Sequence, residues 1–244
     1  MKIFIVVLLS LINILCAQTS DSLKIKKWAI GITGSPDYCN QISSGSKMQM
    51  GYVKSEAKAK LGLTAGVNVL YIVSQRIAVE AAALFSSKGI FVHTPSWATS
   101  GGTYDPTIPN SGLSTIEFEK QSMYTYQYLE IPLKMNYYVL NNKFKMFPSI
   151  GISANVFLGK KTSTNVLDNA EIRKTQISHS YNNKNIPALD AALIIGLGLS
   201  YELNKSLFLK FEPSYRQFIR KMVDYPVNGY LYSFGMNAGI YIRF

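Results

Sequence analysis

Histidine and serine are the residues of this chain that could support nucleophilic catalysis. The sequence contains 2 histidines, His93 and His179. Ser96 follows the first, while Ser178 and Ser180 flank the second. A hydrolase acting on lipid or peptide needs a nucleophile beside a base, so these are the candidate pairs. Both histidines lie in serine-rich polar segments, where composition alone supplies such neighbours, and we therefore predict that the protein is not an enzyme.

No spacing typical of a metal or cofactor site is present. Two histidines and scattered acids do not form a zinc-ligand pattern, and we predict no metal and no cofactor. The glycines recur at strand spacing without a strand-to-helix setting, which argues against a phosphate-binding loop. We interpret Cys39 as an incidental thiol. If Cys16 leaves with an export signal, no internal disulfide can form.

Charged side chains form a second group. They occupy the polar parity of segments in which the other parity is apolar. Acids and bases are balanced in this group: Glu80, Glu130, Lys134, Asp190, Lys210, Glu212, Arg216 and Arg243. Alternate residues of a strand point to opposite faces, so these charges should share an interior. Unpaired buried charges are costly, and we expect a hydrogen-bonded plug, with Glu130–Arg216 or Glu212–Lys134 as its signature. The alternatives are an ion or proton path and a gate.

Period-2 alternation predicts the strands that position these charges. In the final stretch, SFGMNAGIYIRF, apolar residues occupy one parity and mostly small or polar residues the other. Such alternation is typical of a strand with one apolar face. Eight strands are expected on this basis, over residues 28–35, 61–72, 76–87, 124–139, 144–158, 188–203, 206–217 and 230–244.

The connections between these strands alternate strictly between short and long. Two-residue turns (SQ, NN and NK) contrast with long polar segments at 37–60, 88–123, 159–187 and 218–229. Outer-membrane barrels have short periplasmic turns and longer extracellular loops. The sequence thus predicts an all-β fold, an eight-stranded antiparallel up-and-down transmembrane β-barrel over 28–244, with apolar side chains facing lipid. Ten strands are the alternative if 88–123 contains another hairpin.

The first residues are typical of an export signal. Lys2 precedes an apolar run from Ile3 to Leu15, and Ala17 offers a small residue before a cut. We predict a cleaved signal peptide over 1–17 and a short periplasmic segment over 18–27. Acylation of Cys16 is the alternative. No later run approaches the ~18 consecutive apolar residues of a membrane-spanning helix.

Two sets of residues in the long connections are candidates for contacts at the surface. Trp97 and Tyr104 could serve as platforms for a sugar or a protein. A net charge of +11 favours anionic partners, and we expect lipopolysaccharide phosphates to be held by Lys160, Lys161, Arg173 and Lys174. The lysines are dispersed and form no basic, aromatic-interleaved patch, so no nucleic acid is expected.

The stretch YLEIPLKMNYYV (128–139) resembles the small outer-membrane β-barrel family common in Bacteroidetes, often called PorT-like. A glycine-rich segment, PSIGISANVFLG (148–159), and the terminal aromatic Phe244 fit the same family. The resemblance implies a bacterial outer-membrane location. It also implies that Phe244 acts as the signal by which the barrel assembly machinery recognises the chain.

These observations favour a non-enzymatic barrel with a structural or surface-interaction role through its long loops. A narrow pore, or a component of an envelope secretion or transport assembly that contacts other envelope proteins, is the alternative. A lipid or peptide hydrolase is less favoured. A wide diffusion channel is disfavoured because porins use about 16–18 strands.

Overall fold

The computed structural model describes residues 27–43, 57–101, 113–141, 143–168, 171–181, 186–224 and 227–244. The strands within these ranges are β1 (Trp28–Ser43), β2 (Ala57–Ile72), β3 (Ile77–Gly101), β4 (Leu113–Tyr137), β5 (Leu140–Asn141), β6 (Phe144–Asp168), β7 (Glu171–Ser180), β8 (Leu189–Glu202), β9 (Leu207–Phe218), β10 (Met222–Asp224) and β11 (Val227–Arg243). In this part of the chain, no helix is long and apolar enough to cross a membrane.

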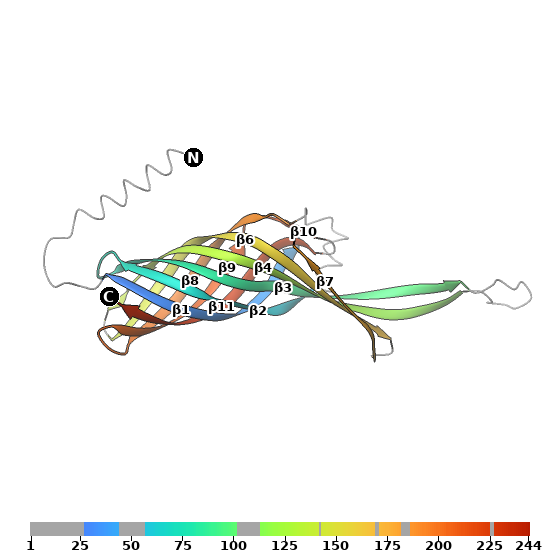
Figure 1. The fold of residues 1–244 in the computed structure, drawn as a ribbon, viewed down its shortest axis with the longest axis horizontal. Helices are drawn as coiled ribbons and strands as arrows, with labels where there is room; N and C mark the ends of the chain where they lie inside the picture. Colours follow the sequence, from blue (N-terminus) through green and yellow to red (C-terminus); the bar gives the residue numbers. More distant parts are fainter. Residues whose placement is uncertain are drawn as a thin grey trace, which may run out of the picture.

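Eight of these strands close into a ring (Figure 1). Neighbours follow the order β1–β2–β3–β4–β6–β8–β9–β11, and β11 pairs back onto β1. All of the pairings are antiparallel, with Ala29 opposite Arg243 at the closure. The short strands β5, β7 and β10 pair beside this ring and do not enlarge it. The prediction of an eight-stranded up-and-down barrel is confirmed, and the ten-strand alternative is wrong because 88–101 and 113–123 lengthen β3 and β4.

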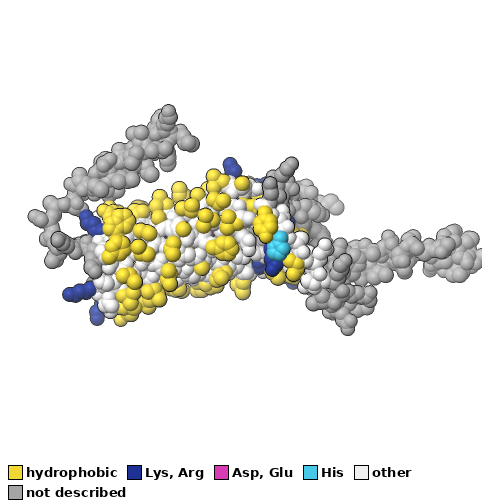
Figure 2. Space-filling view, in the orientation of Figure 1, with side chains coloured by type: hydrophobic (Ala, Val, Ile, Leu, Met, Phe, Trp, Pro, Cys, Tyr) yellow, Lys and Arg dark blue, Asp and Glu magenta, His cyan; other side chains and the backbone are white. Residues whose placement is uncertain are grey.

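The barrel wall is apolar on its outside and polar on much of its inside. Along β8, Leu193, Ile195 and Leu197 are each at least 50% exposed, while the intervening Ile194 is buried. Hydrophobic side chains cover the wall between two ends that carry Lys and Arg (Figure 2). A soluble barrel of this size fills its interior with apolar side chains instead. The arrangement suits a wall that contacts lipid.

The first strand is longer than its sequence pattern suggested. A strand ending at residue 35 was expected, whereas β1 continues to Ser43. Pro36 and the polar residues after it hide the alternation, yet Tyr38 is exposed outside while Asp37 and Cys39 are fully buried. Proline donates no backbone hydrogen bond, but the strand remains paired with β2 on both sides of Pro36. The prediction that Cys39 lies in a loop was therefore wrong.

Two apolar layers fill the two ends of the lumen. One, the turn-side layer, lies nearest the short turns and consists of Ala29, Leu70, Ala78, Tyr138, Phe147, Phe208 and Tyr241. The other, the loop-side layer, consists of Ile90, Val92, Tyr126, Tyr128, Ile186, Ala192, Phe218, Met222 and Leu231. Aromatic rings bury large areas at low entropic cost. The polar part of the lumen therefore lies between two apolar layers.

Several strands continue beyond the ring on the loop side. The β3–β4 pairing runs to Gly101 opposite Leu113, and the β4–β6 pairing to Glu119 opposite Leu167. Figure 1 shows β3 and β4 projecting away from the barrel, at the end opposite the C-terminus. The predicted loops 88–123 and 159–187 are thus largely paired strand in their described parts.

Candidate functional site in the barrel lumen

Buried charged side chains form two groups in the polar part of the lumen. The turn-side quartet consists of Glu80, Lys134, Lys210 and Glu212. The loop-side quartet consists of Asp37, Lys88, Glu130 and Arg216. Each quartet has two acids and two bases, so each is formally neutral. Strand β3 shows the order of the layers, because its inward residues run from Ala78 through Glu80 and Lys88 to Ile90.

In the turn-side quartet, each base contacts both acids. The Lys134 ammonium lies 2.8 Å from Glu212 Oε2 and 3.4 Å from Glu80 Oε1. The Lys210 ammonium lies 2.9 Å from Glu212 Oε2 and also contacts Glu80. None of the four side chains is more than 8% exposed. Charges so deeply buried require this degree of pairing, because desolvation of an unpaired ion costs several kcal/mol (about 3–5 when one partner is removed).

Neutral donors saturate the two glutamates. The groups that donate to Glu80 are the side-chain amides of Asn68 (2.7 Å) and Asn136 (3.1 Å) and the Tyr241 hydroxyl (3.1 Å), and the Ser149 hydroxyl donates to Glu212 (2.7 Å). The Lys210 ammonium also lies 4.8 Å from the centre of the Phe147 ring. That contact joins the quartet to the turn-side layer through a cation–π interaction.

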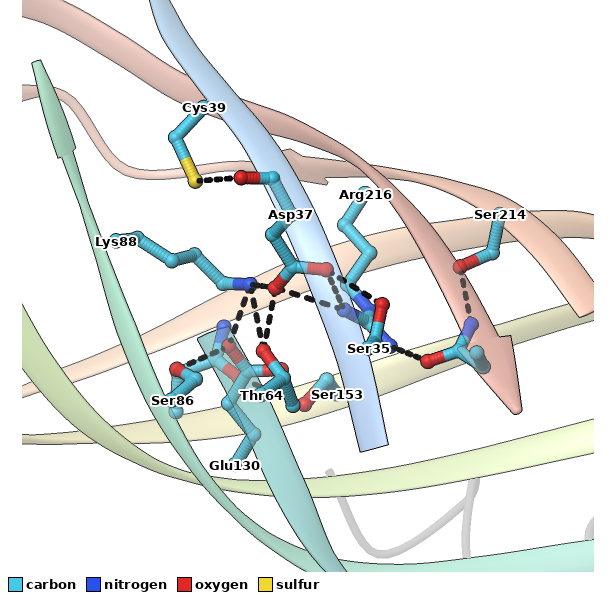
Figure 3. Close-up of polar contacts among 12 residues, drawn as sticks. Ser35, Asp37, Cys39, Thr64, Ser86, Lys88, Glu130, Ser153, Ser214 and Arg216 are labelled. Atoms are coloured by element: carbon cyan, nitrogen blue, oxygen red, sulfur yellow. Dashed lines mark hydrogen bonds and ion pairs between the residues drawn. The ribbon is translucent and has the colours of Figure 1, made fainter. Parts of the chain in front are cut away.

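The loop-side quartet is centred on Asp37 (Figure 3). The Lys88 ammonium lies 2.7 Å from Asp37 Oδ2 and 3.3 Å from Glu130 Oε1. Arg216 Nη1 lies 3.4 Å from both oxygens of Asp37. The hydroxyls of Ser35 and Thr64 also donate to Asp37, and Ser86 donates to Glu130 at 2.6 Å. Asp37 and Lys88 are completely inaccessible to solvent.

Sequence reasoning missed these two central charges. Asp37 and Lys88 both fell in segments that we predicted to be loops, 37–60 and 88–123. A signal was present, because Asp37 keeps the parity of the inward Ser35 and Lys88 keeps that of the inward Ser86. Polar residues at consecutive positions obscured that parity. Strands β1 and β3 therefore both continue, with buried polar side chains, beyond the ends that hydrophobicity alone indicates.

Six of the eight predicted lumen charges lie in the two quartets, and two lie elsewhere. Arg243 pairs with Glu202 at 3.0 Å near the short turns, where Lys145 also contacts Glu202 at 2.8 Å. Asp190 accepts from the backbone N–H of Ala191 (2.6 Å) and of Arg220 (3.0 Å). Asp190 is therefore a partner of backbone amides at the loop-side end of β8.

The expected signature pairs are formed only in part. Lys134 and Glu212 contact each other directly. Arg216, in contrast, has Asp37 as its ion-pair partner within the described residues, and Lys88 takes the place expected for Arg216 beside Glu130. The register of β1 and β3 decides this exchange, and the register could not be read from one sequence.

The lumen leaves little free space around the turn-side quartet. The cavity among the turn-side quartet, Leu84 and Arg216 has a volume of about 10 Å³, room for about one water molecule. Apolar layers lie beyond both quartets. Among the described residues, these layers and quartets leave no evident wet path for an ion, and the ion pairs join the strands of the ring.

The candidate contact residues on the loop side lie mainly on strands. Trp97 belongs to β3, Lys160 and Lys161 to β6, and Arg173 and Lys174 to β7. The Lys160 ammonium lies 4.9 Å from the centre of the Tyr124 ring. The structure does not gather these residues into one cluster, since Trp97 lies opposite Glu117 on the projecting ribbon. Tyr104, the predicted signal peptide over 1–17 and residues 18–26 of the predicted periplasmic segment lie outside the described residues.

The two histidines lie apart on different strands. His93 on β3 lies opposite Gln121, with 3.3 Å between His93 Nε2 and Gln121 Nε2. His179 on β7 lies opposite Lys161. Within the described ranges, no group of three or more His, Cys, Asp or Glu side chains could hold a metal ion.

The comparisons with known proteins concern the barrel as a whole. A family model described as "Outer membrane protein beta-barrel domain" matches residues 16–219. Solved structures similar to this chain include Neisserial surface protein A (9% identity, TM-score 0.45, covering 89% of this chain and 97% of that one). The attachment invasion locus protein Ail of Yersinia pestis is also similar (11% identity, TM-score 0.37, covering 89% of this chain and 98% of that one). So is the outer membrane protease OmpT of Escherichia coli (8% identity, TM-score 0.37, covering 92% of this chain and 99% of that one). No curated protein matches the chain.

Proposed function

The chain belongs to the outer membrane protein β-barrel domain family, and from this premise we propose that it is a non-enzymatic barrel whose projecting strands contact molecules at the cell surface. The observation that carries the proposal is the length of the loop-side strands. Each of β3, β4 and β6 has 25 residues, whereas a membrane-spanning strand needs about 9–11. More than half of each strand exceeds what the bilayer requires.

The projecting strands form a sheet with an open edge. Strand β6 pairs with β4 on one side and, over Lys160–Asp168, with β7 on the other. Within the described residues, β7 pairs with β6 alone. The free backbone groups of an edge strand can pair with an extended segment of a partner. Exposed Ile177 and Tyr181 at this edge would add apolar contacts.

The finer identity of the protein is part of this proposal. The YLEIPL motif of the Bacteroidetes PorT-like barrels lies on β4, where Glu130 joins the loop-side quartet. Phe244 follows β11, is exposed, and donates its backbone N–H to Trp28 O at 2.9 Å. An exposed aromatic end of the last strand supports its proposed role as the assembly signal. Export by a cleaved signal peptide completes the proposal.

A pore is the less favoured function. The neutral quartets, the two apolar layers and the small remaining cavity all oppose ion passage. Separation of His93 from His179 gives no support to the hydrolase alternative.

The test is to shorten the projecting ribbon. Replacing residues 97–117 by Asn-Gly would rejoin β3 and β4 with a two-residue turn between Ser96 and Phe118, which are partners in the native register. Cells producing this variant should adhere several-fold less to mucin-coated surfaces than cells producing the full-length barrel. The matched control removes residues 223–228, which shortens the β10–β11 hairpin on the same side. Equal adhesion of both variants and the wild type, at equal amounts of folded barrel, would refute the proposal.

A further inference from the structure

A row of basic and polar side chains crosses the outer face of the wall on its loop side. Three residues are direct neighbours in register: Thr125 on β4 lies opposite Lys161 on β6, and Lys161 lies opposite His179 on β7. Directly paired residues of antiparallel strands place their side chains on the same face. The flanking residues Tyr124 and Tyr126 turn toward the loop-side layer in the lumen, so the row faces outward.

Lys60 completes the row from the other side. The β2–β3 register shifts between Ala59 and Leu63, which places Lys60 in a bulge. The Lys60 ammonium donates to the Thr125 hydroxyl two strands away. On the strand between them, the partner of Thr125 is Gly89, which has no side chain to block the passage. Bulges commonly redirect a side chain in this way.

This row has no acidic counterpart. The described residues place no carboxylate within ion-pair distance of Lys60 or Lys161, although Lys88, Lys134, Lys145 and Lys210 all have one. Both Lys161 and His179 are exposed. The Lys161 ammonium and the His179 imidazole therefore offer hydrogen-bond donors on the outward face. Lys60 is half-buried and lies opposite the inward Cys39, but its ammonium reaches the row at the Thr125 hydroxyl. Nothing in the described chain neutralises the positive charge of the row.

The height of the row matches the lipid headgroups. A strand tilted by about 40° advances about 2.6 Å per residue along the membrane normal. The outward residues of β4 are apolar from Tyr137 to Leu129, which corresponds to about 21 Å, and Thr125 lies about 31 Å from Tyr137. An apolar band of about 25 Å thus ends between Leu129 and Thr125. Figure 2 shows basic and histidine side chains beside the loop-side edge of the apolar wall.

We propose that Lys60, Thr125, Lys161 and His179 bind the phosphate group of a phosphorylated outer-leaflet lipid. The ammonium groups supply charge-assisted hydrogen bonds to phosphate oxygens. Leu61 and Leu158, exposed directly beside the row at 75% and 41%, supply apolar surface for the acyl chains of the same molecule. Cations at the loop-side edge of the apolar band, next to apolar surface within it, select a lipid over a free anion.

The site differs from the one expected from sequence. Of the four basic residues expected to hold lipopolysaccharide phosphates, the row includes Lys161. Lys160 has the opposite parity and lies over the Tyr124 ring, while the side chains of Arg173 and Lys174 lie outside what the structure describes. Lys60 was not expected, because neither the bulge nor the register is visible in the sequence. This inference is independent of the surface contacts proposed for the projecting sheet.

The test measures lipid retention by the full-length barrel with native mass spectrometry. The probes are diphosphorylated lipid A and the same lipid A after enzymatic dephosphorylation, with inorganic phosphate as a soluble competitor. The Lys60→Gln/Lys161→Gln double variant should bind diphosphorylated lipid A about thirtyfold more weakly than wild type, since each surface lysine contributes about 1 kcal/mol toward anionic lipid. Its affinity for the dephosphorylated lipid should stay unchanged.

A matched control removes two lysines at the opposite end of the barrel. Lys143→Gln/Lys205→Gln carries the same charge change in the short turns and should retain wild-type affinity. An equal loss in both double variants would reduce the effect to net charge and overturn the proposal. Displacement of the lipid by equimolar inorganic phosphate would also overturn it, because the row would then select a free anion. If the Lys60→Gln/Lys161→Gln chain does not fold, the exposed Lys161→Gln change alone should still weaken binding about fivefold.

Discussion

At the scale of single residues, ion pairs inside the lumen and at its rim differ in what remains after one partner is removed. Lys134 is buried between two glutamates, so its loss leaves an uncompensated negative charge in the turn-side quartet. Lys145 is partly exposed beside Glu202, which keeps access to water and to Arg243. The same change of lysine to a neutral residue should therefore have very different costs.

We predict that Lys134→Met lowers the free energy of unfolding by about 3–5 kcal/mol. Lys145→Met should lower it by less than about 1 kcal/mol, because exposed ion pairs contribute little. Urea titration of the barrel in lipid vesicles, followed by the electrophoretic shift between folded and unfolded forms, measures both. Equal midpoints for the two variants would show that the turn-side quartet does not stabilise the ring.

Two glycines provide a second contrast at this scale. A methyl group added at Gly198 would lie 2.1 Å from Phe147 Cζ, inside the turn-side layer, whereas one added at Gly34 meets no atom within 4 Å. Gly198→Ala should destabilise the barrel by about 1–3 kcal/mol through overpacking. Gly34→Ala should be neutral or stabilising by up to about 1 kcal/mol. The same urea titration tests the pair, and a tolerated Gly198→Ala would mean that Phe147 can move aside.

At the scale of elements, the strands were predictable and their ends and register were not. Strong period-2 alternation located all eight ring strands. The pattern failed where consecutive polar residues continue a strand, as at Asp37 and Lys88, because an inward polar residue looks like the start of a loop. Ion-pair partners depend on which residues of neighbouring strands face each other, and that information is absent from a single sequence.

The last strand permits a prediction about assembly. Phe244 lies at the end of β11 and is exposed on the wall, as is Ile242. Phe244→Ala should lower the amount of heat-modifiable barrel in the outer-membrane fraction several-fold. The control, Ile242→Ala, removes a similar apolar area from the same strand without changing the terminal residue. Similar yields for the two variants would mean that the terminal aromatic is not a specific signal.

At the scale of the whole molecule, the layers of the lumen make the barrel a closed cylinder. Two neutral quartets lie between two apolar layers, and the sequence predicted only part of this arrangement. The inward charges were expected, but the inward aromatics Tyr126, Phe147, Phe208 and Tyr241 were not identified as layers. Their parity is shared with the polar residues, so the pattern alone did not separate charged from aromatic positions along the barrel axis.

The closed lumen predicts that the purified protein produces no stable conductance steps in planar lipid bilayers. Ions cannot cross the apolar layers without losing their hydration. The Phe147→Ala/Tyr241→Ala variant removes two rings from the turn-side layer only, and should stay non-conducting because the loop-side layer remains. Regular conductance steps from the wild type would contradict the closed state and favour the pore.

Closure of the ring between β1 and β11 has a consequence for the order of the strands along the chain. Trp28 and Phe244 lie side by side at the seam, joined by a backbone hydrogen bond of 2.9 Å. A short linker could connect them, and new ends could be opened between β1 and β2, giving a circular permutant with the same set of pairings. Such a chain would keep every contact of the native wall but present a different last strand. It would distinguish the contacts that stabilise the ring from the features of the last strand that assembly in the cell requires.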